Sequence, residues 1–411
     1  MTHVLHDFHD NIMLDISQRG KDVSASPIRK LVRYADAAKA KGTKVFHLNI
    51  GQPDILTPKD ALKKVQNADI QIVAYTPSNG VSSYRNALPR YYKKYNLDVK
   101  PDEIIVTSGA SEGIFLTFLA CLNEGDEIIV PEPFYANYNG FAEMANVRIK
   151  PIECSIENGF ALPTISDFEK VISPSTKAIL LCNPNNPTGC VYDEKTLRDL
   201  GVLAKKNNMY LFVDEVYREF CYGETDFFSV LAIPEAADNV VVFDSISKRY
   251  SSCGARIGAI VSRNKLVLET LVKYAELRLS SPTFGQILAE ALVDTPDSYM
   301  ENVKSEYIGR RDLLYRRLSA MEGVKCYLPQ GAFYILAELP IADSDHFCQW
   351  LLESFSTDNQ TIMLAPATGF YANRALGKKQ VRIAYVLNET DLNSAMDCLE
   401  KALERYFLIK N

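Results

Sequence analysis

Several residue types are scarce in this sequence, or are arranged so that whole classes of protein can be excluded. Its longest apolar runs are short stretches such as 178–182, whereas a membrane-spanning helix needs roughly 18 or more such residues. Lys and Arg number 45 against 51 Asp and Glu, a net charge of −6, so the basic surface of a nucleic-acid-binding protein is not expected. With 20 Gly and 19 Pro in 411 residues, a collagenous or low-complexity chain is excluded as well.

Cysteine and histidine are also arranged in an informative way. The nine cysteines are an odd number without a Cys-x-x-Cys pair, which predicts free thiols in a reducing compartment. Residues 1–10 lack the basic-then-apolar pattern of a signal peptide, so the expected location is the cytoplasm. Of five histidines, His3, His6 and His9 are interpreted as part of a polar terminus rather than a metal site. The two that remain are too few for a histidine-built zinc centre, and no metal is expected.

Between residues 100 and 265, short apolar runs alternate with helical patterns. The pattern predicts helices at 111–122 and 194–207, and strands at 103–107, 127–130, 178–182, 210–213, 240–244 and 256–261. Continuous apolar strands separated by helices predict an α/β fold with a mostly parallel sheet covered on both faces. Polar residues that directly follow such strands lie at the edge of the sheet where α/β proteins bind ligands.

After Pro282 the pattern changes to that of a smaller α+β domain. A helical pattern covers 283–319 with a break near Pro296, and strands at 332–337 and 381–385 precede a final helix at 389–406. The first fifty residues, helical at 27–41 and extended at 44–49, lack a core of their own. We therefore expect an N-terminal arm that is part of the small domain (1–50), a large domain (51–295) and a C-terminal small domain (296–411).

Two polar clusters have the residue types that bind phosphate. Ser108-Gly109-Ala110-Ser111 connects a predicted strand to a predicted helix, whose N-terminus offers free N–H groups; helix capping alone also explains such a turn. Ser245-Ile246-Ser247-Lys248 follows another strand, with Arg256 eight residues after the lysine. Arginine clamps phosphate, and a lysine among cations has a lowered pKa and forms Schiff bases, although a solvated loop lysine remains the alternative.

Two further clusters also follow predicted strands. Asp214 comes directly after the strand at 210–213, and a carboxylate buried there needs a cationic partner, such as a protonated ring nitrogen. The run Asn183-Pro184-Asn185-Asn186-Pro187-Thr188-Gly189 is either a tight turn or a binding loop that holds an Asn side chain.

Together and in this order, the four clusters resemble the fold-type-I pyridoxal-phosphate enzymes, specifically the class I and II aminotransferases. The resemblance extends from about residue 49 to the end and includes Asn49–Asp54, Tyr75-Thr76-Pro77, Pro133-Phe134-Tyr135, Asp214-Glu215-Val216-Tyr217 and Arg382 in Val-Arg-Ile-Ala-Tyr. Ser26–Arg29, His47–Gly51 and Met363–Pro366 are most similar to a bacterial aspartate aminotransferase branch.

The resemblance implies a role for each matching residue. Lys248 would bond to pyridoxal 5′-phosphate and move the proton, Asp214 would keep the ring nitrogen protonated, and Tyr135 would stack on the ring. Asn186 and Tyr217 would bind the phenolic oxygen. The expected phosphate ligands are Gly109, Ala110, Ser111, Ser245, Ser247 and Arg256.

The resemblance also implies substrate and subunit contacts. Arg382 would bind the α-carboxylate of amino acid and 2-oxo acid substrates, helped by Asn186 and the Gly51 backbone, and Tyr75 would reach the phosphate of a neighbouring subunit in a homodimer. One branch of the family uses a Lys where this chain has Ser111 for the distal carboxylate of aspartate. Another uses an Arg of the partner subunit, in the region of residues 277–280 here. No distal-carboxylate residue is therefore identified from the sequence.

The leading hypothesis is an aminotransferase that moves an amino group, with L-aspartate as the expected donor, to 2-oxoglutarate by a ping-pong mechanism. The alternatives are an aminotransferase for aromatic or other amino acids, and a lyase of the same fold, either a C–S lyase or an aminocyclopropane-carboxylate-forming synthase. A transcriptional regulator of this fold would need an added helix-turn-helix domain, for which the roughly 25 residues before Ser26 are too few.

Overall fold

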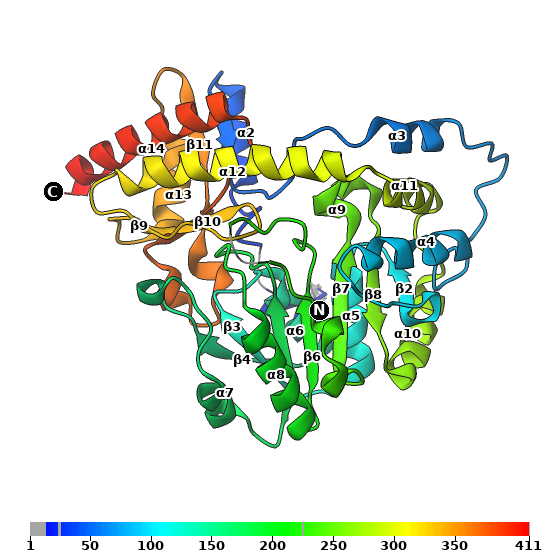
Figure 1. Ribbon diagram of the computed structural model, residues 1–411. Coiled ribbons are helices and arrows are strands. Elements are labelled where there is room, and N and C mark those ends of the chain that lie inside the picture. The colour runs from blue at the N-terminus through cyan, green and yellow to red at the C-terminus, as the bar shows by residue number, and fades with distance from the viewer. Residues whose placement is uncertain (1–13, 24–25, 224–225, 411) are drawn as a thin grey trace, which may run out of the picture.

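The computed structural model describes residues 14–23, 26–223 and 226–410. His3, His6 and His9, interpreted above as part of a polar terminus, lie outside the described residues. Within the described ranges the strands form sheets of seven, four and two strands (Figure 1). No helix within these ranges is both long and apolar enough to cross a membrane.

The large sheet confirms the predicted α/β fold. Its strand order is β2-β8-β7-β6-β5-β3-β4. All neighbours are parallel except β8, which runs antiparallel to both β2 and β7. The strands are β2 (Ile104–Thr107), β3 (Glu127–Glu132), β4 (Arg148–Glu153), β5 (Thr176–Cys182), β6 (Tyr210–Asp214), β7 (Val240–Ser245) and β8 (Gly258–Ser262).

Both faces of this sheet are buried, which explains the continuous apolar runs in the sequence. Along β6, Phe212 packs into one hydrophobic cluster while its neighbours Leu211 and Val213 pack into the other. Successive strand side chains point to opposite faces, so a strand covered on both sides must be apolar at every position. The unpredicted strand β4 lies at the sheet edge and contains Lys150, Pro151 and Glu153, which hide the strand pattern from sequence analysis.

Helices cover the two faces of the large sheet. On one face α5 packs against β7, β8, α6 and α10, and on the other α8 packs against β6 and α7. The helices of this part of the chain are α3 (Lys59–Gln66), α4 (Ser82–Lys93), α5 (Ala110–Cys121), α6 (Asn137–Ala145), α7 (Ile165–Val171), α8 (Glu194–Lys206), α9 (Ile246–Arg249), α10 (Lys265–Arg278) and α11 (Thr283–Val293).

The C-terminal part of the chain forms the four-stranded sheet, in the order β12-β13-β10-β9, with helices around it. The long helix α12 extends from the side of the large sheet to the small sheet (Figure 1). The elements are α12 (Asp297–Ser319), β9 (Lys325–Cys326), β10 (Tyr334–Glu338), α13 (Ser344–Glu353), β11 (Gln360–Met363), β12 (Ala365–Pro366), β13 (Gln380–Ala384) and α14 (Glu389–Lys410).

The N-terminal segment joins this C-terminal part. Strand β1 (Lys44–His47) pairs in parallel with β11, and α2 (Val32–Ala40) packs against α13. The short helix α1 (Gln18–Asp22) precedes them. The helix predicted over 27–41 begins only at Val32, because residues 27–31 form a turn in which the Arg29 and Lys30 N–H groups donate to the Ser26 carbonyl.

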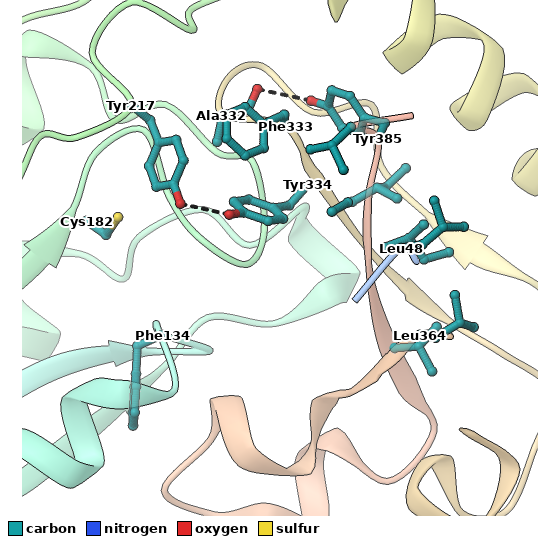
Figure 2. Packing of buried hydrophobic residues seen from close by; sticks show 14 of the residues in the cluster. Leu48, Phe134, Cys182, Tyr217, Ala332, Phe333, Tyr334, Leu364 and Tyr385 are labelled. Carbon is teal, nitrogen blue, oxygen red and sulfur yellow. Dashed lines mark hydrogen bonds between the residues drawn. The ribbon is translucent and has the colours of Figure 1, made fainter. Parts of the chain in front are cut away.

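An aromatic cluster joins the large sheet to the small sheet (Figure 2). Tyr217, which follows β6, has its hydroxyl oxygen 2.8 Å from that of Tyr334 on β10. Beside them the Tyr385 hydroxyl donates to the Ala332 carbonyl at 3.3 Å, and the Phe333 ring lies between these contacts. Because these rings are fully buried, they hold the two sheets at a fixed separation next to the strand ends of the large sheet.

Candidate active site

A cavity of ≈ 680 Å³ lies where the carboxyl ends of the parallel strands meet the small sheet. It collects nearly all of the residues that the sequence singled out, from segments far apart in the chain. Those that line it are Gly51, Ala110, Ser111, Tyr135, Asn186, Asp214, Tyr217, Ser245, Ser247, Lys248, Arg256 and Arg382. Gly109 lies directly behind this wall, and Tyr75 does not reach the cavity.

One end of the cavity is built to receive an anion. Gly109 is the N-cap of α5 with φ of 85°, and an added Cβ there would lie 2.4 Å from Arg256 Nη2. The position therefore needs glycine for both its conformation and the close approach of the guanidinium. Arg256 is held by donation to the Cys253 carbonyl at 2.9 Å and the Ser108 carbonyl at 3.2 Å. The free N–H groups of α5 and this cation face the same space.

The β7–α9 turn adds two hydroxyls to that end. The Ser245 and Ser247 hydroxyl oxygens lie 2.8 Å apart, and the Ser245 Oγ accepts the Ser247 N–H at 3.1 Å as the N-cap of α9. Both serines are buried and line the cavity. The serines, the arginine and the helix N-terminus together form a binding site of the right chemistry for a phosphate.

Asp214 lies at the deep side of the cavity and has no ion pair with any described residue. Its carboxylate accepts hydrogen bonds from the Tyr138 hydroxyl at 2.9 Å and the Val216 N–H at 3.3 Å. Burial raises its pKa to about 6, and these hydrogen bonds only partly oppose that effect. Ionising a buried carboxylate is unfavourable without a cation. None of the described residues forms an ion pair with Asp214, and a protonated ring nitrogen would be a suitable partner.

Lys248 projects into the same cavity from α9. Its Nζ donates to the Gly51 carbonyl at 2.7 Å, and Cys253 Sγ lies 3.9 Å away. Burial lowers the pKa of this amine; Cys253 opposes the shift, while the Arg382 and Arg256 charges add to it. A larger share of the neutral, nucleophilic amine is therefore present than for a lysine in water.

Arg382 lies on β13 and is 1% exposed. Its Nη1 donates to Asn186 Oδ1 at 2.9 Å and its Nη2 to the Asn49 carbonyl at 2.5 Å, while Nε has no partner among the described residues. Burial lowers its pKa, and no carboxylate among the described residues forms an ion pair that would oppose this shift. The intramolecular ion pair that a structural arginine would need is thus missing, and a substrate carboxylate would supply the charge.

Two other sequence-derived candidates take positions away from the cavity. The side chain of Tyr75 is 80% exposed. Arg278, from the region considered for a distal-carboxylate arginine, instead donates to Ser281 Oγ and to the Ser78 and Val106 carbonyls, 3.6 Å from Glu112. Its guanidinium is therefore held within its own subunit.

Residues that line the cavity or support it from behind were also missed by the sequence analysis. Tyr138 bonds Asp214 from helix α6, and Tyr334 bonds Tyr217 from a strand that is otherwise apolar. An added Cβ on Gly51 would lie 1.7 Å from Tyr334 Oη, so glycine is needed there for close packing. A buried tyrosine in an apolar strand looks like a core residue in the sequence, and only the fold shows that its hydroxyl faces a cavity.

Comparison with known proteins shows which family the chain belongs to. Residues 43–399 match the family model described as aminotransferase class I and II. The chain belongs to the class I and II aminotransferases. It is 32% identical over 395 residues to an aspartate aminotransferase of Pyrococcus horikoshii, covering 95% of this chain and 97% of that protein.

Two solved structures extend this family relationship to the fold. An aspartate aminotransferase from Thermus thermophilus with maleate superposes with a TM-score of 0.86 at 28% identity, covering 95% of this chain and all of that one. An alanine aminotransferase from Pyrococcus furiosus superposes with a TM-score of 0.87 at 31% identity, with the same coverage. The family and fold-type expectations are confirmed, and the chain is an aminotransferase with the family's architecture.

Proposed function

We propose that this aminotransferase uses pyridoxal 5′-phosphate to move the amino group of L-aspartate to 2-oxoglutarate in a ping-pong reaction. The observation that supports it best is a single cavity that contains a half-buried lysine amine, a buried carboxylate without an ion-pair partner and a buried guanidinium without one. Each of the three lacks, within the described chain, the partner that this cofactor or its substrate would supply.

The residues present fit the cofactor at both ends. Arg256, Ser245, Ser247 and the N-terminus of α5, beginning at Ala110 and Ser111, would hold the phosphate. Asp214 would hold the ring nitrogen in its protonated form, with Tyr138 orienting the carboxylate. Tyr135 lines the same cavity and would provide the stacking face; Asn186 and Tyr217 would bind the phenolic oxygen. When bound, pyridoxal phosphate supplies an electron-withdrawing ring that stabilises negative charge at the substrate Cα.

The chain's own groups then perform the proton transfer and orient the substrate. Lys248 would hold the cofactor through its Nζ, and its amine would carry the proton between the substrate Cα and the C4′ carbon of the cofactor, a role that its lowered pKa favours. Arg382 binds the α-carboxylate through its planar fork, with Asn186 fixing the plane of the guanidinium. Because Arg382 lies on strand β13 of the small sheet and Lys248 lies on α9, directly after strand β7 of the large sheet, the aromatic contact between Tyr217 and Tyr334 helps to set the distance between them.

The proposed donor is supported by the names of the relatives, among which aspartate aminotransferases from several organisms occur. The alanine aminotransferase of Pyrococcus furiosus superposes equally well, so alanine is the second candidate donor. Neither Lys at position 111 nor an arginine from residues 277–280 is available to select aspartate, since position 111 is Ser and Arg278 is held by carbonyl groups.

A half-reaction decides between these possibilities. The cofactor-loaded protein is incubated with one amino acid at a time and no 2-oxo acid. An aminotransferase releases about one equivalent of the corresponding 2-oxo acid per subunit. A C–S lyase instead turns over repeatedly on an amino acid with a sulfur leaving group at Cβ, such as cysteine, and releases the thiol or sulfide and ammonia. Aspartate is expected to react with the highest kcat/KM. Repeated release of ammonia from cysteine, with no 2-oxo acid formed from aspartate or alanine, would disprove the proposal.

We also propose a homodimer in which Tyr75 contacts the phosphate site of the partner. Exposed apolar side chains lie on both sides of Tyr75: Ile72 and Val73 in its own segment, and Phe284 on α11. The Thr283 hydroxyl donates to the Ala74 carbonyl at 3.4 Å, which places the two segments next to each other. Such a contiguous apolar face supports contact with a second subunit. Nine free cysteines support the proposed cytoplasmic location.

A further inference from the structure

The charges of the described residues that line the cavity do not balance. Four are cationic, namely Arg29, Lys248, Arg256 and Arg382, and Asp214 is the one carboxylate among them. The proposed function accounts for three of the cations: Arg256 for the cofactor phosphate, Lys248 for cofactor attachment and Arg382 for the α-carboxylate. Arg29 remains without an assigned anion.

Arg29 also differs from the other three in its contacts. Lys248, Arg256 and Arg382 each donate side-chain hydrogen bonds to their own chain, whereas the Arg29 guanidinium has no hydrogen bond or ion pair with a described residue. Its side chain is exposed, at a wall of the cavity. Arg29 and Tyr135 line the same cavity, and the Arg29 charge acts on the Tyr135 phenol in the same direction as those of Arg382 and Arg256, opposing the rise in pKa that burial causes.

The backbone that carries Arg29 is tied to the α-carboxylate site. Asn49 Nδ2 donates to the Ile28 carbonyl at 2.7 Å, and the Asn49 carbonyl accepts from Arg382 Nη2 at 2.5 Å. On the next residue, Lys30 forms an ion pair with Asp345 of α13. The two hydrogen bonds of Asn49 therefore connect the Arg29 segment to Arg382, and the Lys30 ion pair separately connects it to α13.

We propose that Arg29 binds the distal carboxylate of dicarboxylic substrates and thereby selects aspartate and glutamate over monocarboxylic amino acids. This proposal rests on the proposed function, and it names the selecting residue that the sequence left unidentified. A substrate held by Arg382 at its α-carboxylate extends its other end within the cavity, where Arg29 is the free cation among the lining residues. In the empty site the Arg29 guanidinium is exposed to solvent, so no unpaired charge has to be buried there. When a dicarboxylic substrate covers it, the guanidinium pairs with the distal carboxylate and so contributes selectivity.

Binding of two inert acids to the cofactor-loaded protein tests this without turnover. Succinate has two carboxylates on four carbons, and butyrate replaces one of them by a methyl group. By calorimetric titration, Arg29→Gln should raise the Kd of succinate about tenfold or more, the effect of losing a hydrogen bond to a charged group at a partly solvated site. The Kd of butyrate should change much less, and Arg29→Lys should restore part of the succinate affinity.

Arg33→Gln is the matched control, because Arg33 is an exposed arginine of the same segment that packs on Tyr34 outside the cavity. In turnover, the ratio of kcat/KM for aspartate to that for alanine should fall about tenfold in Arg29→Gln and stay constant in Arg33→Gln. Equal losses of succinate and butyrate binding, or an unchanged ratio, would overturn the role of Arg29 while leaving the aminotransferase function intact. If no amino acid yields a 2-oxo acid, the proposed function fails instead.

Discussion

Directly beneath the Ser245–Lys248 turn lies a buried ion cluster, in which replacing Asp244 by Asn should have a large and specific effect. The five members of this cluster are Glu215, Arg218, Glu219, Asp244 and Arg249, none more than 7% exposed. The Asp244 carboxylate contacts the Arg249 guanidinium and lies 3.5 Å from Arg218 Nη1. It also accepts the Tyr92 hydroxyl at 2.9 Å and the Ser245 N–H at 2.8 Å.

The magnitude follows from the burial of both guanidinium groups. Asp244→Asn keeps the side-chain volume but removes the carboxylate that Arg218 and Arg249 share, which leaves each guanidinium with a single carboxylate among the described residues, Glu215 for Arg218 and Glu219 for Arg249. Breaking a buried ion pair in this way reduces the free energy of unfolding by about 3–5 kcal/mol. With an entropy of unfolding of about 2.1 cal/mol/K per residue over the whole chain, that corresponds to a fall in Tm of roughly 3–6 °C.

The assay compares Asp244→Asn with Asp294→Asn by thermal and urea unfolding. Asp294 also pairs with an arginine, Arg90 at 2.8 Å, but both side chains are more than half exposed. That surface pair contributes about 1 kcal/mol or less, so its variant should melt within about 1 °C of the parent. Equal losses in the two variants would refute the reasoning, because burial would then have no influence on the value of the ion pair.

Asp244→Asn should also change how the stability of the fold depends on pH, and it should weaken cofactor binding. Burial acts to raise the pKa of Asp244, but Arg249, Arg218 and the Tyr92 hydrogen bond outweigh it and hold the pKa below its usual range. A depressed pKa stabilises the fold above the unfolded pKa of about 3.9, so the stability gap between parent and variant should narrow as the pH falls below about 4. Because Asp244 orients the Ser245 N–H, cofactor affinity should also fall.

Three further predictions concern the proposed roles. Asp214→Asn should still bind the cofactor but lose most turnover. Spectrophotometric titration of the parent should show cofactor affinity weakening as the pH drops through about 6, the pKa of Asp214, and the variant should not show this pH dependence. Arg382→Lys should raise KM for every amino acid and 2-oxo acid alike with an unchanged Tm, and selective loss for dicarboxylic substrates would reassign this arginine to the distal carboxylate. Tyr75→Ala and Lys248→Ala subunits, each inactive, should regain up to about a quarter of parental activity when mixed, because half of the dimers then contain one intact site; no recovery in proven heterodimers would place Tyr75 outside the partner's site.

Much of the candidate site is encoded locally, and the sequence alone singled out most of the predicted residues that line the cavity. The strands before Asn186, Asp214 and Lys248 are buried on both faces, so they appear as continuous apolar runs, and the polar residues that follow them mark the functional edge of the sheet. The same logic predicted the strand-to-helix turn at Gly109, because its small residues and helix N-terminus are features of neighbouring residues.

Only the tertiary structure decided which residues from elsewhere complete the cavity. Tyr138 and Tyr334 look like core aromatics in the sequence, and their hydroxyls acquire partners only when helix α6 and strand β10 pack against the end of β6. The antiparallel direction of β8 depends on pairing between strands distant in the chain, which its own residues do not encode. Arg29 is an ordinary surface arginine by its local pattern. Its place beside the cavity depends on the Asn49 bridge between the N-terminal segment and β13, a contact between residues more than 300 positions apart.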